Sequence, residues 1–438
     1  MARPFPSCLP SPAAAKGLPP LKFVVAETDL KDSERAILFF IRDKIALDNF
    51  APVIHSLQNC NHPVIVVAAN RLLYRMIRES WWFAQSRSAK LILRATLGSP
   101  SSTTERVGRI RWNQYTLQQF VRRANIGLIV MDWGEGVPNS DVKLLSRMYR
   151  WLFTGFAIQL LIVAKRLDIP TVALPHGHSA PTKLVLSQHV KQIMNLNDGK
   201  LQFRDRDSYS AYVFESFYKR DIILSNSTMS GHNVMVWGSA RVNDYWVNLL
   251  YSETEAAVFE LATHEQRKIL FFIPKWSSLV SRQATLQLVS AIVAKKTNTV
   301  IMRAHARSEA SGFTKEERAE LCRLGDVVFV PEDTTSPSLI KSCDVLIDAG
   351  SSIAFDAVLL GKPYVRPRYL QDSSVITIWD QLGGAHQTDS PEATVELVSD
   401  ASLQPAPRDP TFDQVVFGGA GVDVLQRYRN GLLALMAR

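Results

Sequence analysis

The chain has 438 residues, of which 46% are hydrophobic and 21% charged; this balance excludes a disordered protein and leaves room for two domains. The formal net charge of +9 suits nucleotide phosphates, a phosphorylated acceptor, a membrane surface or nucleic acid, or has no specific cause. The four cysteines form no CxxC or CxxH pair, which argues against a zinc site and a disulfide framework and fits a reducing compartment.

The N-terminal half begins with a segment, residues 1–20, that is rich in proline and small residues and predicts a flexible tail without a signal peptide. The strongest apolar run, residues 151–164, is too short to span a bilayer and predicts a buried helix. Short apolar runs predict parallel strands covered on both faces. These strands are 63–69, 126–132, 170–176, 221–227 and 233–239.

A helical, linker-like stretch over residues 245–267 leads into a second series of strands and helices. The predicted strands are 268–274, 299–305, 326–332, 344–350 and a short one from 362, and the predicted helices are 283–296, 352–361 and 422–438. The sequence therefore predicts an α/β protein with two Rossmann-like, doubly wound domains, residues 21–250 and 251–438, the second carrying the terminal helix. No GxGxxG or Walker A motif follows a strand, which argues against a nicotinamide oxidoreductase or a P-loop ATPase.

The segment DAGSSIAFD holds the sharpest candidate site. Gly350 allows a tight turn after a predicted strand, and Ser351 and Ser352 stand where a helix is expected to begin. Unpaired N–H groups and two hydroxyls at that point can cradle a phosphate, although the serines would equally serve as N-caps with no ligand. Asp356, one turn further on, can hold a hydroxyl group or stabilise the loop.

The segment ALPHGHSAPTK predicts acid–base chemistry. His176 stands at a strand end beside a glycine, where a histidine can act as general base near neutral pH, or simply bond to the backbone. His178 is a weaker candidate, and Lys183 can meet a phosphate.

Three further strand ends carry charged candidates. Arg303 and His305 alternate, so both can point to one side and contact a diphosphate or a base, or lie in solvent. Lys275, in IPKWSS, is a candidate phosphate ligand, and Glu135, in MDWGEG, is a second acid or base unless it lies in a surface turn.

The segment VWGSARVNDYW lies between the two halves. Arg241 is a candidate anion contact, and Asp244 is a candidate catalytic carboxylate. Basic and aromatic residues also interleave in RESWWFAQSRSAK and RIRWNQY, but without a nucleic-acid motif we expect no nucleic-acid partner.

In their order, these elements resemble the CDP-glycerol glycerophosphotransferase family of teichoic acid synthesis and related capsule-type GT-B transferases. The HG-x-P-x-K element of the family is similar to HGHSAPTK, and its D-Y-S-S-x-x-F-D element is similar to DAGSSIAFD. Its G-x-P-R-x-D element is similar to GSARVND, where Ala240 replaces proline. PKWSS keeps only Trp276 of the P-T-W-R turn, and RAHA has Ala306 for the proline of R-x-H-P. The order agrees over residues 170–368.

The resemblance implies a GT-B fold with two domains facing an interdomain cleft. It implies His176 as catalytic acid or base, His305 as its partner or a phosphate ligand, and Ser351 and Ser352 as phosphate binders. The implied activity needs no cofactor or metal. It moves a glycosyl or glycerol-phosphate unit from a CDP- or CMP-linked donor to a lipid-linked or polymer glycan acceptor of the bacterial cell surface.

Two other functions stay open. A UDP-sugar 2-epimerase shares this fold and would release free nucleotide and isomerised sugar without an acceptor. A nucleotide- or glycan-binding protein would show no turnover. For the transferase, we expect a cytoplasmic location with peripheral association at the inner face of the cell membrane, because the chain is basic.

Overall fold

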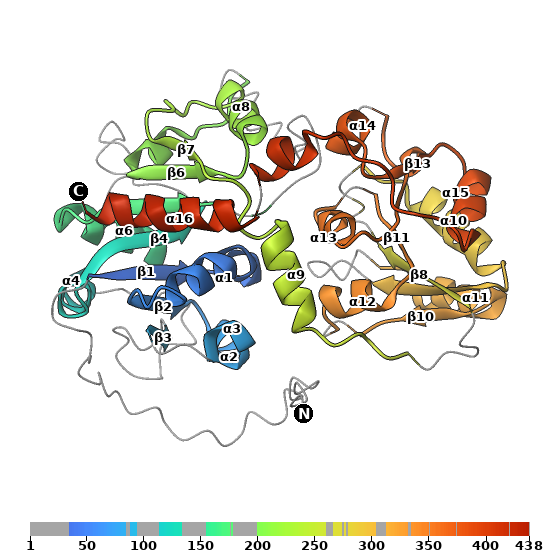
Figure 1. Cartoon of the computed structure of the whole chain (residues 1–438), viewed down its shortest axis with the longest axis horizontal. Helices are drawn as coiled ribbons and strands as arrows, with labels where there is room; N and C mark the ends of the chain where they lie inside the picture. Colours follow the sequence, from blue (N-terminus) through green and yellow to red (C-terminus); the bar gives the residue numbers. More distant parts are fainter. Residues whose placement is uncertain are drawn as a thin grey trace. The chain divides into compact units, whose positions relative to one another are not determined.

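The chain folds into two compact units, each built around a parallel sheet (Figure 1). The computed structural model describes residues 35–84, 88–93, 114–133, 155–175, 177, 199–259, 266–273, 276, 279–303, 312–331, 334–349, 351–373, 375–419 and 421–437. Within these, the N-terminal unit comprises the residues up to 243 together with 413–437, and the C-terminal unit comprises 244–412.

The N-terminal unit has a seven-stranded sheet in the order β3-β2-β1-β4-β5-β6-β7. Its strands are β1 (Ala36–Ile41), β2 (Val64–Ala68), β3 (Ala89–Leu93), β4 (Ile126–Asp132), β5 (Thr171–Leu174), β6 (Ala211–Phe214) and β7 (Val234–Val236). Its helices are α1 (Lys44–Gln58), α2 (Arg71–Glu79), α3 (Trp81–Ala84), α4 (Gln114–Arg123), α6 (Phe156–Arg166), α8 (Phe217–Ser225) and α16 (Gly421–Met436), with short turns at Arg204–Ser208 and Asp413–Phe417.

The C-terminal unit repeats the same topology in a six-stranded sheet, in the order β10-β9-β8-β11-β12-β13. Its strands are β8 (Arg267–Phe272), β9 (Asn298–Arg303), β10 (Val327–Phe329), β11 (Val345–Ile347), β12 (Tyr364–Pro367) and β13 (His386–Thr388). Its helices are α9 (Asp244–Ser252), α10 (Arg282–Val293), α11 (Lys315–Leu324), α12 (Ser336–Ser342), α13 (Ala354–Leu359), α14 (Ile378–Leu382) and α15 (Pro391–Ser399), with a short turn at Arg368–Leu370.

The central strands of the N-terminal sheet are apolar except for Asp132 at the end of β4, as expected where helices cover both faces of a parallel sheet. Every residue of β1, β2 and β4 is buried. Helix α1 begins where the Asp43 carboxylate accepts the backbone N–H groups of Ile45 and Ala46, and it packs against α16. These caps and buried strands fix the carboxyl edge of the sheet, where the loops with polar side chains begin.

The predicted fold class of two doubly wound parallel α/β domains is confirmed. The prediction of a strand over 221–227 is wrong, because these residues lie in and just after α8. The Ser216 hydroxyl accepts the backbone N–H of Lys219 and starts a helix, and within α8 only Ile223 is fully buried. Strands β1, β3, β6 and β13 were not predicted.

The terminal helix α16 belongs to the N-terminal unit, whereas its place in the sequence predicts that it is part of the C-terminal domain. It packs against α1 and β4, as Figure 1 shows. Gly431 leaves room for the ring of Trp237, which a Cβ atom at that position would contact too closely. The predicted flexible tail, residues 1–20, lies outside the described residues.

None of the helices in the described ranges combines the length and the apolar character that crossing a bilayer requires.

Candidate functional site

Each sheet has a point where the strand order reverses, between β1 and β4 in one unit and between β8 and β11 in the other. In open parallel sheets, ligands bind at the carboxyl ends of the strands beside such a point. The segment DAGSS directly follows β11, and Arg303 ends β9, the neighbour of β8. The fold therefore places the main predicted donor-site segments of the C-terminal unit at the same edge of the sheet, on two strands that flank β8.

The turn after β11, defined by residues 348–353, is organised by a buried carboxylate. The Asp348 side chain accepts the backbone N–H of Ser351 at 2.6 Å, and only 1% of Asp348 is exposed. Burial raises the pKa of Asp348, against the hydrogen bonds from Ser351. Ser351 and Ser352 are exposed and precede α13, which begins at Ala354 rather than at 352 as predicted. The turn thus presents two hydroxyl groups at the sheet edge.

Two other predicted residues of this unit are buried by contacts within it. The guanidinium of Arg303 donates a 2.6 Å hydrogen bond to the carbonyl oxygen of Pro331. Asp356, in α13, is 1% exposed and accepts a 3.2 Å hydrogen bond from the hydroxyl of Tyr251 in α9. Asp356 therefore links the helix after the turn to α9.

The loop after β7 holds Arg241, which is 8% exposed. Its Nε atom lies 2.8 Å from a carboxylate oxygen of Asp48 in α1, an ion pair within the N-terminal unit. Asp244 is exposed and is the first residue of α9 in the C-terminal unit.

The remaining predicted residues lie outside the described residues. These are Glu135, His176, His178, Lys183, Lys275, His305 and Gly350.

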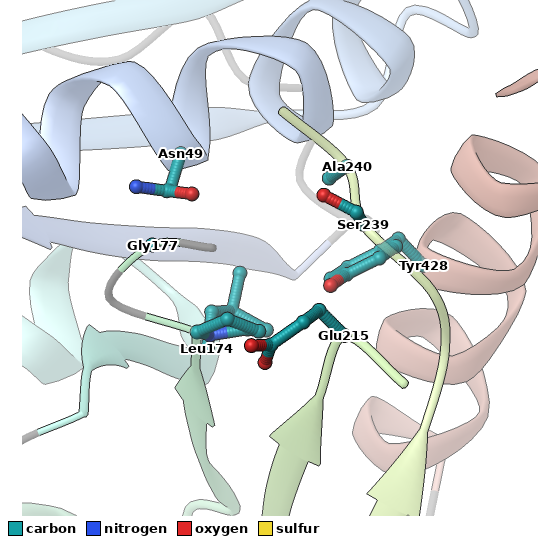
Figure 2. A pocket seen from close by; sticks show the side chains of 8 residues that line it. Asn49, Leu174, Gly177, Glu215, Ser239, Ala240 and Tyr428 are labelled. Carbon is teal, nitrogen blue, oxygen red and sulfur yellow. The ribbon is translucent and has the colours of Figure 1, made fainter. Parts of the chain in front are cut away.

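A small pocket lies at the carboxyl ends of β5 and β6 in the N-terminal unit (Figure 2). We call it the strand-end pocket. Pro175 and Gly177, which flank His176 in the sequence, contribute to its wall. Its lining consists of Asn49, Leu174, Pro175, Gly177, Glu215, Ser239, Ala240 and Tyr428.

Glu215 is a functional candidate that the sequence analysis missed. It directly follows β6 and is 1% exposed. Burial raises the pKa of its carboxyl group to about 7, although the Lys219 ammonium opposes this shift. No other described residue donates a hydrogen bond to either carboxylate oxygen. The signal in the sequence was an acid placed directly after the apolar run AYVF, the same pattern that marked the other strand ends.

The loop over the pocket is held by the C-terminal segment of the chain. Gly238 has a φ of +97°, which favours glycine, and a Cβ atom there would lie 2.8 Å from the carbonyl oxygen of Phe417. The Ser239 amide donates to that same oxygen at 2.8 Å, and the Tyr428 hydroxyl donates to the Gly238 carbonyl at 2.8 Å. The loop is therefore rigid where Ser239 and Tyr428 reach towards the pocket (Figure 2).

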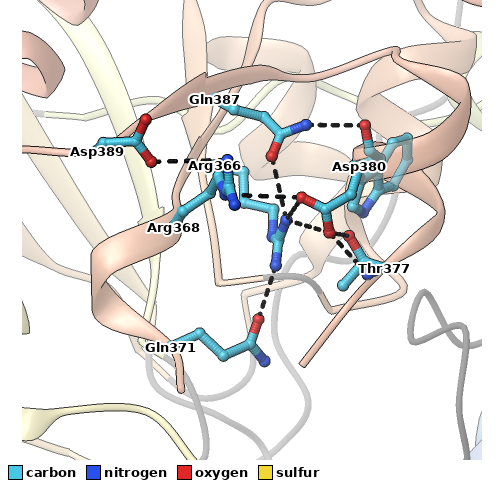
Figure 3. A network of polar contacts seen from close by, with 8 residues as sticks. Arg366, Arg368, Gln371, Thr377, Asp380, Gln387 and Asp389 are labelled. Carbon is cyan, nitrogen blue, oxygen red and sulfur yellow. Dashed lines mark hydrogen bonds and ion pairs between the residues drawn. The ribbon is translucent and has the colours of Figure 1, made fainter. Parts of the chain in front are cut away.

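A second polar cluster surrounds Arg366 of β12 in the C-terminal unit (Figure 3). One guanidinium nitrogen lies 2.9 Å from both carboxylate oxygens of Asp380 and 3.3 Å from Gln387, and another donates to Gln371 at 3.1 Å. Burial raises the pKa of Asp380, but the Thr377 amide and Arg366 outweigh it and hold that pKa below its usual value. The cluster links β12 to α14 and β13, and its central cation, Arg366, is buried.

In the described part of the chain, no three histidine, cysteine, aspartate or glutamate side chains are arranged to hold a metal ion. The turn after β11 can donate hydrogen bonds to an anion, and Glu215 can take up or release a proton.

No family model and no curated protein matches the chain. Its structure is similar to solved UDP-N-acetylglucosamine 2-epimerases. One has a TM-score of 0.54 at 12% identity, covering 91% of this chain and 95% of that chain. A putative enzyme from Listeria monocytogenes has a TM-score of 0.52 at 10% identity, covering 90% and 94%. The enzyme from Neisseria meningitidis, bound to UDP-GlcNAc, has a TM-score of 0.50 at 12% identity, covering 92% and 100%.

The fold is GT-B. At these identities the similarity shows a shared fold and leaves the reaction to be argued from the residues of this chain.

Proposed function

We propose that this protein is a transferase that moves a glycosyl or glycerol-phosphate unit from a nucleotide-activated donor to a glycan acceptor. CDP- and CMP-linked donors are favoured, and the acceptor is a lipid-linked or polymeric precursor of a cell-surface polysaccharide or teichoic-acid-like polymer. The observation that carries the proposal is the turn after β11, because it presents Ser351 and Ser352 at the reversal point of the C-terminal sheet. This is where open α/β sheets bind their ligands.

The donor diphosphate is proposed to bind at this turn. Exposed hydroxyl groups and backbone N–H groups are good phosphate donors, and the bond from Ser351 to Asp348 fixes the shape of the loop before the ligand arrives. Asp356 supports the turn through Tyr251. Further phosphate contacts are proposed from Gly350, Arg303, Lys275, Arg241 and Lys183.

The catalytic groups are proposed from the resemblance of the motifs. His176 acts as acid or base with His305 as its partner, and Asp244 and Glu135 are further candidate carboxylates. Pro175 and Gly177 line the strand-end pocket, which supports placing the chemistry beside His176.

A UDP-N-acetylglucosamine 2-epimerase is the second candidate. The observation that favours it is the similarity of the fold to the three solved epimerase structures described above, with TM-scores of 0.50 to 0.54. A protein that binds nucleotides or glycans without turnover is the third candidate.

Thermal-shift measurements against CMP, CDP, UMP, UDP, GDP and ADP test the donor site. A ligand that binds only the folded state raises its stability, so the nucleotide of the donor should raise the melting temperature of the wild type. A Ser351→Ala/Ser352→Ala variant should lose this rise, and Ser252→Ala, at the exposed end of α9, should keep it. A rise that the double variant retains would contradict the donor site.

Product analysis then separates the three functions. Incubation with UDP-N-acetylglucosamine alone should yield UDP and an isomerised sugar for an epimerase, but no isomer for a transferase. Nucleotide release that depends on an added glycan acceptor identifies the transferase, and binding without any release identifies the third candidate.

Peripheral membrane association is proposed from the net charge of +9. Co-sedimentation with anionic liposomes should be strong at low salt and weaken as salt is added, because salt screens exposed charges. No sedimentation at low salt would contradict this proposal.

A further inference from the structure

The strand-end pocket contains a buried acid that has no hydrogen-bond donor among the other described residues. Glu215 is 1% exposed, and no other described residue donates a hydrogen bond to its carboxylate oxygens. Burying such a group is costly unless it is paired, and an unpaired buried polar group calls for an explanation. A substrate hydroxyl group that enters the pocket would supply the missing hydrogen bond.

The backbone on both sides of Glu215 is fixed, so the side chain is held in this place. On the strand side, the Trp133 indole donates to the carbonyl oxygen of Val213 at 2.8 Å. On the helix side, the Ser216 hydroxyl caps α8 by accepting the backbone N–H of Lys219 at 3.1 Å. Figure 2 shows the carboxylate of Glu215 beside Leu174, with Tyr428 towards the backbone end of the side chain.

The chemistry around the carboxylate favours a neutral ligand with hydroxyl groups over an anion. In the described part of the chain, the charged or ionisable groups that interact with Glu215 are Lys219 on α8 and Tyr428 on α16. The Tyr428 hydroxyl is already held by the Gly238 carbonyl. A phosphate group would meet the negative charge of Glu215, whereas a sugar or polyol hydroxyl can donate to it and can accept from the Ser239 hydroxyl.

We propose that the strand-end pocket binds a hydroxyl group of a neutral sugar or polyol, and that Glu215 takes up the proton of that hydroxyl during transfer. The proton-transfer step rests on the proposed transferase function. The O–H bond breaks and its proton passes to a carboxylate oxygen of Glu215, while the hydroxyl oxygen forms a bond to the reacting carbon or phosphorus of the donor. The bond from that atom to the nucleotide breaks, and the nucleotide leaves with the electron pair. Glu215 then releases its proton to solvent.

The binding step is tested by saturation-transfer NMR with N-acetylglucosamine, glycerol and glycerol 3-phosphate on the full-length protein. Wild type should transfer saturation to the two neutral probes and less to glycerol 3-phosphate. Glu215→Leu, an apolar change of similar size that suits a buried site, should lose the transfer. Glu79→Gln, an exposed acid in α2 of the same unit, should keep it. No transfer to neutral probes on wild type, or full transfer on Glu215→Leu, overturns the pocket assignment.

The proton-transfer step is tested with the donor whose nucleotide stabilises the wild type. Glu215→Gln should slow nucleotide release by roughly 100- to 10,000-fold, as expected for loss of a general base, and leave the nucleotide-dependent thermal shift unchanged. Release within threefold of wild type, roughly 0.6 kcal/mol, would overturn the role of Glu215. Wild type that binds none of the nucleotides would instead contradict the proposed function, and the NMR result would then decide the pocket alone.

Discussion

The hydroxyl group of Tyr428 donates a 2.8 Å hydrogen bond to the carbonyl oxygen of Gly238, which lies 190 residues earlier in the chain. The rings of Tyr428 and Trp237 also pack edge to face, with centroids 5.3 Å apart. Through these contacts the last helix of the chain completes the strand-end pocket of the N-terminal unit. The pocket therefore requires α16, which packs in the N-terminal unit although it comes after the C-terminal unit in the sequence.

Tyr428→Phe should destabilise the N-terminal unit by about 1–3 kcal/mol. The ring contact with Trp237 remains, but the buried carbonyl of Gly238 loses the donor supplied by this hydroxyl. Urea unfolding measures the change. Tyr115→Phe, at an exposed residue of α4, is the control and should change the stability by less than about 0.5 kcal/mol. Equal effects of the two substitutions would contradict a stabilising role for the bond.

Gly238→Ala should destabilise the N-terminal unit more strongly, lowering its free energy of unfolding by about 2–5 kcal/mol. Its φ of +97° is strained for any residue with a Cβ, and that atom would lie 2.8 Å from both the Phe417 oxygen and a Val424 methyl group. Gly155→Ala is the matched control, because a Cβ atom at Gly155 meets nothing within 4 Å and the position precedes α6. It should cost less than about 1 kcal/mol in the same unfolding measurement. A mild effect at Gly238 would mean that the loop can shift away from Phe417.

Much of the fold follows from local patterns in the sequence. The apolar run over 126–132 predicts β4 residue by residue, and the runs before Arg303 and Asp348 predict β9 and β11. Because parallel strands end at one edge, these runs also predict that the two segments share an edge. Helix α8 was missed because its apolar residues DIIL look like a strand, and only the cap at Ser216 indicates a helix.

The strand-end pocket could not be predicted, because its walls come from distant parts of the chain. Glu215 shares the pocket wall with Asn49 of α1 and Tyr428 of α16, which lie far from it in the sequence. Likewise, nothing near Arg241 indicates that Asp48, far away in sequence, would pair with it. Local spacing predicts which side chains stand at a strand end, and long-range packing decides which of them are enclosed.

The Arg366–Asp380 pair should respond unequally to the loss of either partner. Asp380→Ala should lower the free energy of unfolding by about 3–5 kcal/mol, because the buried Arg366 guanidinium, whose side chain is 3% exposed, loses its carboxylate partner. The Thr377 amide also loses its acceptor. Arg366→Met should cost less, because the stem stays apolar and Asp380 keeps its bonds from Thr377. Urea unfolding compares the two, with Asp389→Ala at an 81% exposed side chain as control. A larger loss for Arg366→Met would contradict this ranking.

Glu215 should make the stability of the N-terminal unit depend on pH. Burial raises the pKa of this carboxyl group from 4.5 to about 7, so between these values the folded state binds more protons than the unfolded state. The stability of the wild type therefore falls as pH rises through this window, by about 3 kcal/mol in total, and the loss is complete above the folded pKa. Glu215→Gln has no such proton to lose. Its stability relative to wild type should rise by about 3 kcal/mol between pH 4.5 and pH 8, because this single titration is removed.

Urea unfolding of the wild type and the variant at a series of pH values gives this difference directly, since titrations elsewhere in the chain cancel. Glu79→Gln is the matched control because the exposed Glu79 carboxylate, whose ion pair with Arg78 spans 3.5 Å, loses little hydration on folding. The difference for this control should stay nearly flat across the same window. A flat difference for Glu215→Gln as well would mean that the carboxyl group is solvated or paired in the folded protein, and the strand-end pocket would then lack the acid on which its proposed role depends.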